Sequence, residues 1–289
     1  MIEIRPAEQA DKSRIEEISS KIWDGDDYVP LVFDKWVAQE NGEFSVVTID
    51  GVVAGCTKIT ELPHDVLWLE GIRVDTDYRG KGLGREMAKY QIQRSKEMGY
   101  SRLELSTFVE NYESIAIIEK NGFERVASFK FLMKALEEEL PKYEAPRDIS
   151  EFQLITDFEE ARSILDLINT KNRQSYINLD WTFLKCDEEI LKELLSRKMI
   201  FKYKDTVFAF GNWEQKDDGM TLYFMFGPQK QEILHYVLFQ AQKKNSSNVI
   251  IMSDGGTKEH EILYKHGFMR FTDMDNDAFV YRYKDSGAC

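Results

Sequence analysis

The stretch WLEGIRVDTDYRGKGLGREMAKYQIQRSKEMG, residues 68–99, sets the architecture that we expect of this chain. In residues 68–74 successive side chains would point to opposite faces of a strand, and the β-branched Ile72 and Val74 favour that conformation. An amphipathic helix is predicted from about Leu83 to Met98. The stretch therefore predicts a strand, a glycine-rich turn and a helix in immediate succession.

The turn Arg79-Gly80-Lys81-Gly82-Leu83-Gly84, which we call the glycine loop, has the composition of a phosphate site. Alternate glycines let the backbone approach a ligand with its N–H groups turned inward. The following helix directs the positive end of its dipole to the same place. With the charges of Arg79, Lys81 and Arg85, the loop predicts a phosphate-bearing ligand, most simply a pyrophosphate. The alternative is a surface turn that merely precedes a helix.

Two common phosphate motifs do not fit the glycine loop. The chain has no Gly-x4-Gly-Lys-Ser/Thr run, and a GxGxxG fingerprint beginning at Gly80 would need a glycine at position 85, which is Arg85. The pattern Arg79-x-x-Gly82-x-Gly84 instead resembles the acetyl-CoA loop, Arg/Gln-x-x-Gly-x-Gly/Ala, of the GCN5-related N-acetyltransferase (GNAT) superfamily.

Further pieces of that signature follow in order. Ile72-Arg73-Val74 lie where the family strand hydrogen-bonds the pantetheine arm, and Asn111-x-x-Ser114 with Glu119–Phe123 resemble the later Asn-helix-Lys-x-Gly-Phe element. The resemblance covers about residues 1–135 and implies acetyl-CoA as co-substrate and an amine as acceptor. It implies that the cofactor is bound by Ile72, Arg73, Val74, Arg79, Gly80, Lys81, Gly82, Leu83, Gly84, Arg85, Asn111 and Ser114.

Composition bounds the class of protein. A length of 289 residues suits two domains, and 43% hydrophobic with 12% aromatic residues supports packed cores. A net charge of −13 argues against nucleic acid or an anionic membrane as a partner.

Three widely separated cysteines, Cys56, Cys186 and Cys289, predict a reducing compartment without a disulfide framework. No Cys/His cluster suggests a metal. Because the sequence has neither an apolar leader nor a long apolar run, we expect a cytoplasmic protein.

The chain as a whole reads as two α/β domains with a mixed sheet in each. Residues 1–136 are predicted to form a GNAT domain, and the charged, proline-bearing residues 137–150 a linker. In residues 151–289, Lys265-His266-Gly267-Phe268 echoes Lys120-Asn121-Gly122-Phe123, with a predicted strand, helix and strand before it. This repeat predicts a tandem arrangement with a degenerate second GNAT-like domain. The alternative is an unrelated α/β domain with a chance match.

We expect no acetyl-CoA site in the second domain. Gly227-Pro228-Gln229-Lys230-Gln231 offers one glycine, and a proline without an N–H, where the glycine loop should be. The domain would instead cover a sheet edge, wall the substrate cleft or form a homodimer contact.

Acetyl transfer to an amine needs a neutral amine, a polarised thioester carbonyl and a stable leaving thiolate. Gly71 is a candidate β-bulge, and backbone N–H groups near Gly71 and Ile72 are candidates for polarising the carbonyl. Glu70 is the candidate base, expected to share a strand face with Ile72. The alternative is that Glu70 is a structural carboxylate.

The resemblance also implies a tyrosine, four residues before Gly122, that protonates the thiolate, but Ile118 stands there. Either Tyr112 or Ser114 donates a proton, or the thiolate leaves and takes its proton from water, which a thiol pKa of about 8.5 permits.

The loop at residues 24–30 is acidic, which favours a cationic acceptor. Asp27-Tyr28-Val29-Pro30, Phe33-x-x-Trp36 and residues 68–74 resemble the vertebrate histidine N-acetyltransferase and its relatives. This implies a free amino acid or similar small amine, with Asp27, Tyr28 and Trp68 at the acceptor site. A peptide or protein amine is an alternative acceptor, and a non-catalytic acyl-CoA-binding sensor or scaffold is an alternative function.

Overall fold

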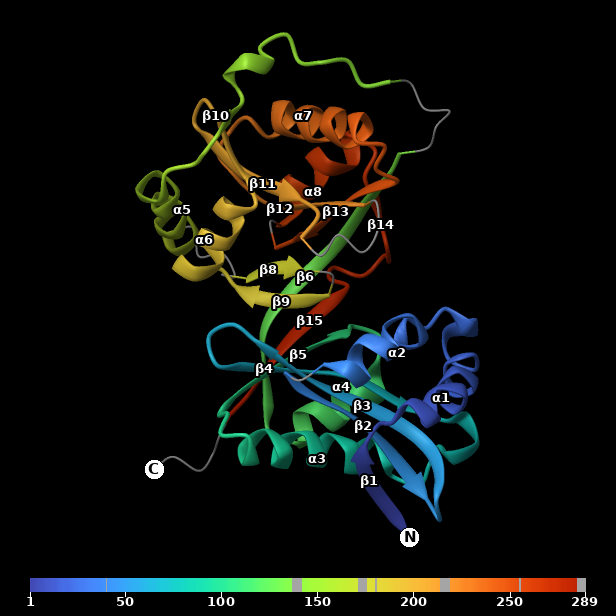
Figure 1. Ribbon diagram of the computed structural model, residues 1–289. Helices are drawn as coiled ribbons and strands as arrows, with labels where there is room; N and C mark the ends of the chain where they lie inside the picture. The colour runs from blue at the N-terminus through green and yellow to red at the C-terminus, as the bar shows by residue number, and fades with distance from the viewer. Residues whose placement is uncertain are drawn as a thin grey trace. The chain divides into compact units, whose positions relative to one another are not determined.

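The computed structural model of the chain divides into two compact units (Figure 1). The first unit comprises Met1–Val126 and the residues from Val280 onward, and the second comprises Ala127–Phe279. The structure describes residues 1–39, 41–136, 142–170, 176–179, 181–213, 219–254 and 256–284.

The first unit is a mixed sheet with helices on both faces. Its helices are α1 (Lys12–Ser19), α2 (Val29–Ala38), α3 (Leu83–Glu97) and α4 (Tyr112–Lys120). Its strands are β1 (Ile2–Pro6), β2 (Gly42–Ile49), β3 (Val52–Leu62), β4 (Val66–Val74), β5 (Arg102–Phe108), the start of β6 (Phe123–Ala135) and the end of β15 (Ala278–Tyr283). They lie in the order β1-β2-β3-β4-β5-β15-β6, with β4 and β5 parallel.

Two apolar layers hold the helices of the first unit to its sheet. The helices α1 and α2 pack on one face, where Ile15, Ile18 and Phe33 are fully buried. On the other face α3 packs through Leu83 and Met87 (Figure 1). The amphipathic helix predicted from about Leu83 to Met98 is confirmed as α3. Asp50 and Gly51 form the turn of the hairpin between β2 and β3, with φ of +51° and +83°.

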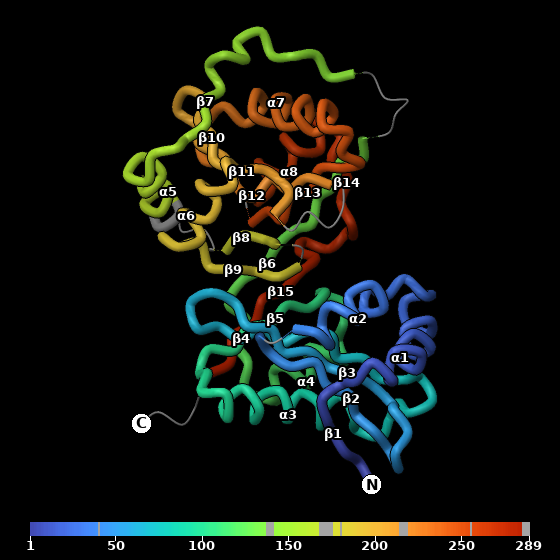
Figure 2. The backbone as a smooth tube through the Cα atoms, in the orientation of Figure 1, coloured from blue at the N-terminus to red at the C-terminus, as the bar shows by residue number. Residues whose placement is uncertain are grey.

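The last strand of the chain is part of the first unit. β15 lies between β5 and β6 in the strand order, and Figure 2 traces the red end of the chain back to the first unit. Arg282 Nε donates to Glu104 at 2.8 Å, and Tyr281 Oη donates to Glu119 at 3.0 Å. The sequence analysis does not anticipate this strand.

The second unit repeats the arrangement of sheet and helices. Its helices are α5 (Phe158–Thr170), α6 (Glu188–Ser196), α7 (Lys230–Lys243) and α8 (Gly256–Lys265). Besides parts of β6 and β15, its strands are β7 (Gln153–Leu154), β8 (Tyr176–Leu179), β9 (Thr182–Lys185), β10 (Ile200–Tyr203), β11 (Thr206–Gly211), β12 (Met220–Phe226), β13 (Asn248–Ser253) and β14 (Met269–Arg270). The main order is β6-β13-β12-β11-β10-β7, and β8 pairs with β9.

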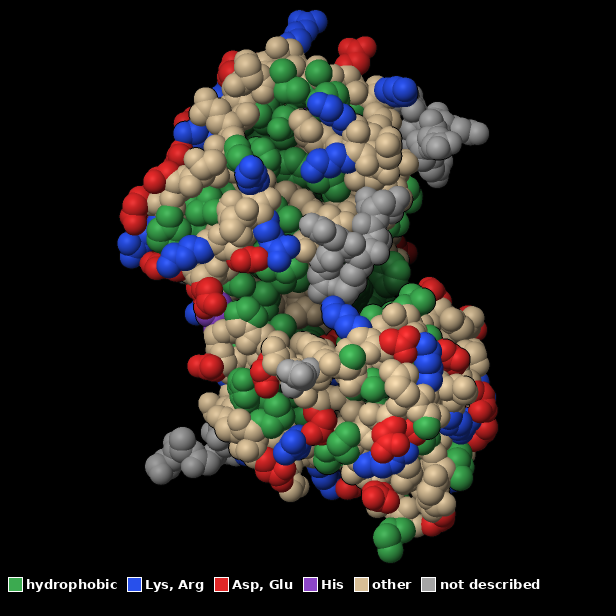
Figure 3. Space-filling model, in the orientation of Figure 1, with side chains coloured by type: hydrophobic (Ala, Val, Ile, Leu, Met, Phe, Trp, Pro, Cys, Tyr) green, Lys and Arg blue, Asp and Glu red, His purple; other side chains and the backbone are tan. Residues whose placement is uncertain are grey.

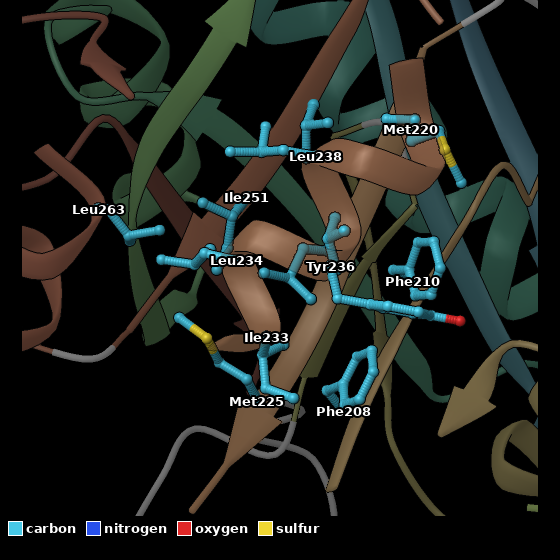
Figure 4. Packing of buried hydrophobic residues seen from close by; sticks show 14 of the residues in the cluster. Phe208, Phe210, Met220, Met225, Ile233, Leu234, Tyr236, Leu238, Ile251 and Leu263 are labelled. Carbon is cyan, nitrogen blue, oxygen red and sulfur yellow. The ribbon is translucent and has the colours of Figure 1, made fainter. Parts of the chain in front are cut away.

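The core of the second unit surrounds α7 (Figure 4). Ile233, Leu234 and Val237 of this helix have no exposed surface, and Tyr236 lies beside Phe208 and Phe210 of β11. α7 therefore packs on the sheet through one broad apolar face. The mixed α/β class and the tandem arrangement predicted from the sequence are confirmed by this topology.

The compact units divide the chain at other places than the predicted 1–136, 137–150 and 151–289. β6 continues past Val126 into the second unit, where it pairs with β13. Residues 137–141 lie outside the described residues. Residues after them contact α7, since the amide of Tyr143 donates to Gln242 at 2.6 Å.

Surface charge on the first unit is mixed in sign. On the face drawn in Figure 3, the Lys and Arg side chains of this unit lie interspersed with Asp and Glu side chains. Among the described residues, no helix is both long and apolar enough to cross a membrane.

Ending the chain at Phe279 should unfold the first unit selectively. Val280 and Tyr281 are 0% and 1% exposed, and burying each such side chain contributes about 1.5–3 kcal/mol. Losing both contributions is a large change, because the free energy of unfolding of a typical protein is about 5–15 kcal/mol. Hydrogen exchange should therefore accelerate in β5, while α7 keeps its protection. A chain ending at Lys284 is the control, and equal protection of β5 in the two proteins would contradict this role of β15.

Candidate active site

β4 and β5 separate after a short parallel ladder. Both strands are fully described, and their pairing runs from Val66–Arg102 to Trp68–Glu104, so residues 69–74 lie beyond the last rung. We call the rung of Trp68 and Glu104 the fork. Past the fork a wedge opens at the carboxyl ends of the strands, the usual position of ligands in open α/β sheets.

Charged groups fix the fork from the side of β5. Glu104 is 1% exposed, and its carboxylate accepts hydrogen bonds from Arg102 Nε at 2.9 Å and Arg282 Nε at 2.8 Å. Trp68 is also buried at the fork, 2% exposed. The predicted acceptor residue Trp68 therefore lies in the interior of the first unit.

The predicted β-bulge at Gly71 is confirmed. Arg73 pairs with Cys56 and Glu70 pairs with Lys58, so β4 carries one residue more than β3 in this interval. Gly71 has a φ of +70°, and a Cβ there would lie 3.1 Å from the ring of Trp36. A side chain at this position would therefore be strained and crowded.

The bulge places Glu70 and Ile72 on opposite faces of the sheet. Glu70 accepts a hydrogen bond from Thr60 Oγ1 at 2.6 Å, whereas Ile72 packs with Leu83 and Met87 beneath α3. The expectation that Glu70 and Ile72 share a face is therefore wrong, because one inserted residue reverses the alternation that follows it.

Tyr28, just before α2, lies within the electrostatic reach of Glu70. Burial raises the pKa of the Tyr28 hydroxyl, and the negative charge of Glu70 raises it further. The ring stacks edge-on against Trp36 at 5.8 Å between centroids. Tyr28 thus stays protonated at neutral pH, and the structure brings these two predicted site residues together.

Asp27 and Arg73 satisfy each other. Asp27 accepts from Arg73 Nε at 3.1 Å and from Nη2 at 2.9 Å, and the Asp27 side chain has no exposed surface. The guanidinium also lies 4.5 Å from the ring centroid of Trp23. Hence neither charged group is available to a ligand, and only the exposed Asp24 and Asp26 keep the acidic character of this loop.

The glycine loop is open to solvent. Gly80 and Gly82 have φ of +76° and +80°, and a Cβ on either would meet no described atom within 4 Å. Both glycines are thus needed for backbone conformation, and the space next to them is free. Gly84 lies in the first turn of α3, where a Cβ would make ordinary contact with Ile117 at 3.5 Å.

The amides of the loop, those of residues 80–84, have no backbone partner among the described residues. Leu83 is buried and anchors α3, Val74 packs nearby, and Arg79, Lys81 and Arg85 are exposed. Unpaired amides, a helix N-terminus and cationic side chains together form a site suited to an anion.

α4 presents a helix cap at the predicted Asn-helix element. Asn111 Oδ1 accepts from the amide of Ser114 at 3.4 Å. Ile118 is half-buried, while Tyr112 is 67% exposed. The two proton donors suggested from sequence thus differ in setting, since Ser114 is half-buried in the first turn and Tyr112 is mostly in solvent.

The sequence analysis missed two residues of β3 that lie beside Glu70. These are Thr60, which donates to its carboxylate, and Lys58, which lies opposite it in the ladder. Lys58 has no exposed surface, and burial lowers its pKa to about 8. A lysine in the middle of a predicted strand was the available signal, but its partner depends on the register.

The corresponding place in the second unit is filled by side chains. A Cβ on Gly227 would lie 2.3 Å from Thr206 Oγ1, and the amide of Gln229 donates to that oxygen at 3.0 Å. Lys230, at the start of α7, forms an ion pair with the buried Glu259. Among the described residues, no group of three or more His, Cys, Asp or Glu has a metal-binding arrangement.

This geometry agrees with the comparison to known families. Residues 11–123 match the model of the acetyltransferase (GNAT) family. This matched segment holds β4, the glycine loop and α3.

Similarity to individual proteins is partial. Identity is 31% over 91 residues with the uncharacterised N-acetyltransferase YjgM of Escherichia coli, covering 32% of this chain and 51% of that protein. It is 37% over 59 residues with the spermine/spermidine N(1)-acetyltransferase of Bacillus subtilis, covering 20% and 39%. It is 27% over 122 residues with the N-alpha-acetyltransferase RimI of Mycobacterium tuberculosis, covering 41% and 75%. The chain spans about half or less of the first curated relatives that it matches, at 33%, 51% and 38% of their lengths.

Solved structures match the whole chain in fold. A GCN5-related N-acetyltransferase from Sphaerobacter thermophilus has a TM-score of 0.65 at 11% identity, covering 97% of this chain and 95% of that one. A tandem GNAT protein from the clavulanic acid biosynthesis pathway has a TM-score of 0.59 at 11% identity, covering 98% of both chains. Both units thus take part in a tandem GNAT fold.

Asp27→Ala should destabilise the first unit by about 3–5 kcal/mol, because it leaves the buried guanidinium of Arg73 without its counter-ion. Urea unfolding monitored by tryptophan fluorescence would measure the change. Asp26→Ala removes the neighbouring exposed carboxylate and should stay within about 0.5 kcal/mol of the original protein. Equal midpoints for the two variants would contradict the assignment of Asp27 to Arg73.

Proposed function

We propose that the first unit transfers the acetyl group of acetyl-CoA to a primary amine of a small molecule. The observation that carries this proposal is the open glycine loop at the N-terminus of α3, beside the wedge between β4 and β5. The match of residues 11–123 to the acetyltransferase (GNAT) family model supports the same reaction class.

The residues of the site fit acetyl-CoA. The amides of residues 80–84, with Arg79, Lys81 and Arg85, would hold its pyrophosphate. The main chain of Ile72, Arg73 and Val74 would hold the pantetheine arm, and Asn111 and Ser114 at the start of α4 would complete the site. When bound, acetyl-CoA supplies a thioester whose acetyl group an amine can attack.

The bulge supports the polarising step. Gly71 and Ile72 lie between the two paired positions of β4, so their amides interrupt the regular β3 ladder at the acetyl end of the wedge. An amide N–H at this place can donate to the oxygen on which negative charge develops during acyl transfer.

Glu70 is proposed as the general base. Its carboxylate is half-buried and held by Thr60 at 2.6 Å, so it has a fixed position from which to accept a proton from the acceptor ammonium, directly or through water. For the departing thiolate we favour protonation by water, because Ile118 offers no proton and a thiol pKa of about 8.5 makes the thiolate a tolerable leaving group.

We propose a cationic small amine, with a free amino acid as one candidate acceptor. The exposed carboxylates of Asp24 and Asp26 would attract a cation, and Tyr28 would line its path to Glu70. Asp27 would act indirectly, by holding Arg73 and so the shape of this loop. The names of the partial relatives include both a polyamine and an N-alpha-acetyltransferase, so a peptide amine is the second acceptor class to test.

A non-catalytic acyl-CoA sensor is the alternative function, and the isoleucine at position 118 favours it. Both functions predict cofactor binding. A thiol-release assay with acetyl-CoA across amino acids, polyamines and short peptides separates them, because only the transferase releases thiol in an amine-dependent way.

Glu70→Gln should lower turnover by about 100-fold or more, because the amide cannot accept the proton. Acetyl-CoA affinity by calorimetry should stay unchanged. Glu61→Gln, on neighbouring β3, is the matched control and should keep normal turnover. Normal turnover in Glu70→Gln would remove Glu70 from the mechanism.

Gly82→Val should abolish acetyl-CoA binding, since the side chain would occupy the space beside the loop amides. Gly51→Val is a matched control, because Gly51 has a φ of +83° against +80° at Gly82, and a Cβ on either meets no described atom within 4 Å. Both variants therefore carry the same backbone strain. If calorimetry gives them equal affinity, the glycine loop does not bind the cofactor.

A further inference from the structure

We propose that Lys58 is a positioning residue that keeps Glu70 ionised, and so ready to accept a proton from the amine. The inference rests on the proposed function, in which Glu70 is the base. It concerns the pair formed by Lys58 and Glu70 across β3 and β4.

The two residues are held opposite each other by backbone contacts. They form one rung of the antiparallel ladder next to the bulge, and directly opposite residues of such a ladder project on the same face. Gln91 of α3, 2% exposed, adds a second link, because its Nε2 donates to the carbonyl of Lys58 at 2.9 Å and to that of Glu70 at 3.3 Å. The ladder and Gln91 together therefore hold Lys58 and Glu70 opposite each other.

Lys58 is an unusual lysine because none of its surface is exposed. Its Nζ donates to the carbonyl of Ile59 at 2.9 Å, which satisfies one of three donors. A buried ammonium is costly unless negative charge compensates it. Burial lowers the pKa of Lys58 to about 8, and the charges of Glu70, Glu43 and Glu61 oppose that shift.

Glu43, on β2, has its own hydrogen-bond partners on α3. Its carboxylate accepts from Arg94 Nε at 2.7 Å and from the hydroxyl of Tyr90. Glu61 lies further along β3, and Lys35 of α2 acts on Lys58 in the opposite direction. Of the three carboxylates, Glu70 acts most strongly on the ammonium, and it is the one directly opposite Lys58 in the ladder.

The stabilisation must be mutual. If the carboxylate of Glu70 favours the charged form of Lys58, the ammonium favours the charged form of Glu70 by the same coupling free energy. On the other side of Glu70, the hydroxyl of Tyr28 stays protonated and carries no charge, and Arg73 is paired with Asp27. Lys58 thus lowers the pH above which Glu70 can act as a base.

The test is Lys58→Met, which keeps an unbranched apolar side chain and removes the charge. Carbon-13 NMR of glutamate-labelled protein would follow the titration of Glu70, with Glu70→Gln used to assign the signal. In Lys58→Met the pKa of Glu70 should rise by about one unit. The acid limb of kcat/KM for the amine should move upward by the same amount, with acetyl-CoA affinity unchanged.

Thr60→Val is the matched control, because it removes a neutral hydrogen bond to Glu70 from the same strand and leaves the ammonium. Its acid limb should move less than that of Lys58→Met. A Glu70 titration that is the same with and without Lys58 overturns the inference, even if the enzyme is active. If the Glu70 titration shifts but the protein acetylates no amine, the pairing is supported and the proposed function is contradicted.

If Lys58→Met does not fold, the reciprocal measurement replaces it. Glu70→Gln removes the carboxylate, so the pKa of Lys58, followed by NMR of its Cε, should fall below about 8. An unchanged Lys58 titration in that variant contradicts the pairing.

Discussion

The extra residue in β4 is the constraint on which the candidate site depends. A strand in a sheet normally has its N–H and C=O groups paired on both sides, which leaves none for a ligand. Here the parallel ladder with β5 ends at Trp68, and the ladder with β3 is interrupted at Gly71. The two interruptions lie within a few residues of each other. Backbone groups at the centre of the sheet thereby become available, and a side chain at Gly71 would be strained by its φ of +70° and crowded by Trp36.

A site built from interrupted ladders needs support from elsewhere, and the C-terminal strand supplies it. β5 has lost β4 as a neighbour beyond the fork, so its other edge must be well held. β15 occupies that edge, and Arg282 binds the buried Glu104 at the fork itself. A segment that follows the whole second unit thus supports a strand that borders the candidate site of the first. This gives a physical reason for the two units to remain on one chain, because the first sheet is incomplete without the last strand.

Local features of the site could be predicted from sequence, and long-range ones could not. The glycine loop, the bulge at Gly71 and the helix α3 each depend on neighbouring residues, so composition and spacing are sufficient. The bulge was expected, but Ile72 was still assigned to the wrong face of the sheet. Its face follows only when the strand pairing shows where the extra residue lies. The roles of Lys58 and β15 depend on pairing between segments that are distant in sequence. The periodicity of a single segment does not indicate which other segment pairs with it. Asp27 illustrates a third limit, since an acidic loop has the same composition whether its carboxylates face solvent or a buried arginine.

In the second unit, a few side chains occupy the place corresponding to the glycine loop. This unit keeps the short parallel ladder, in which β12 and β13 pair only at Met220–Val249 and Thr221–Ile250. At the start of α7, however, the hydroxyl of Thr206 accepts the amide of Gln229, and Lys230 is neutralised by Glu259. A helix N-terminus has the same unpaired amides and the same dipole in both units. What differs is whether these amides have partners within the protein. In the first unit the glycine loop leaves them open, whereas in the second unit the amide of Gln229 donates to a side chain, so the same topology gives an open helix start in one unit and a packed one in the other.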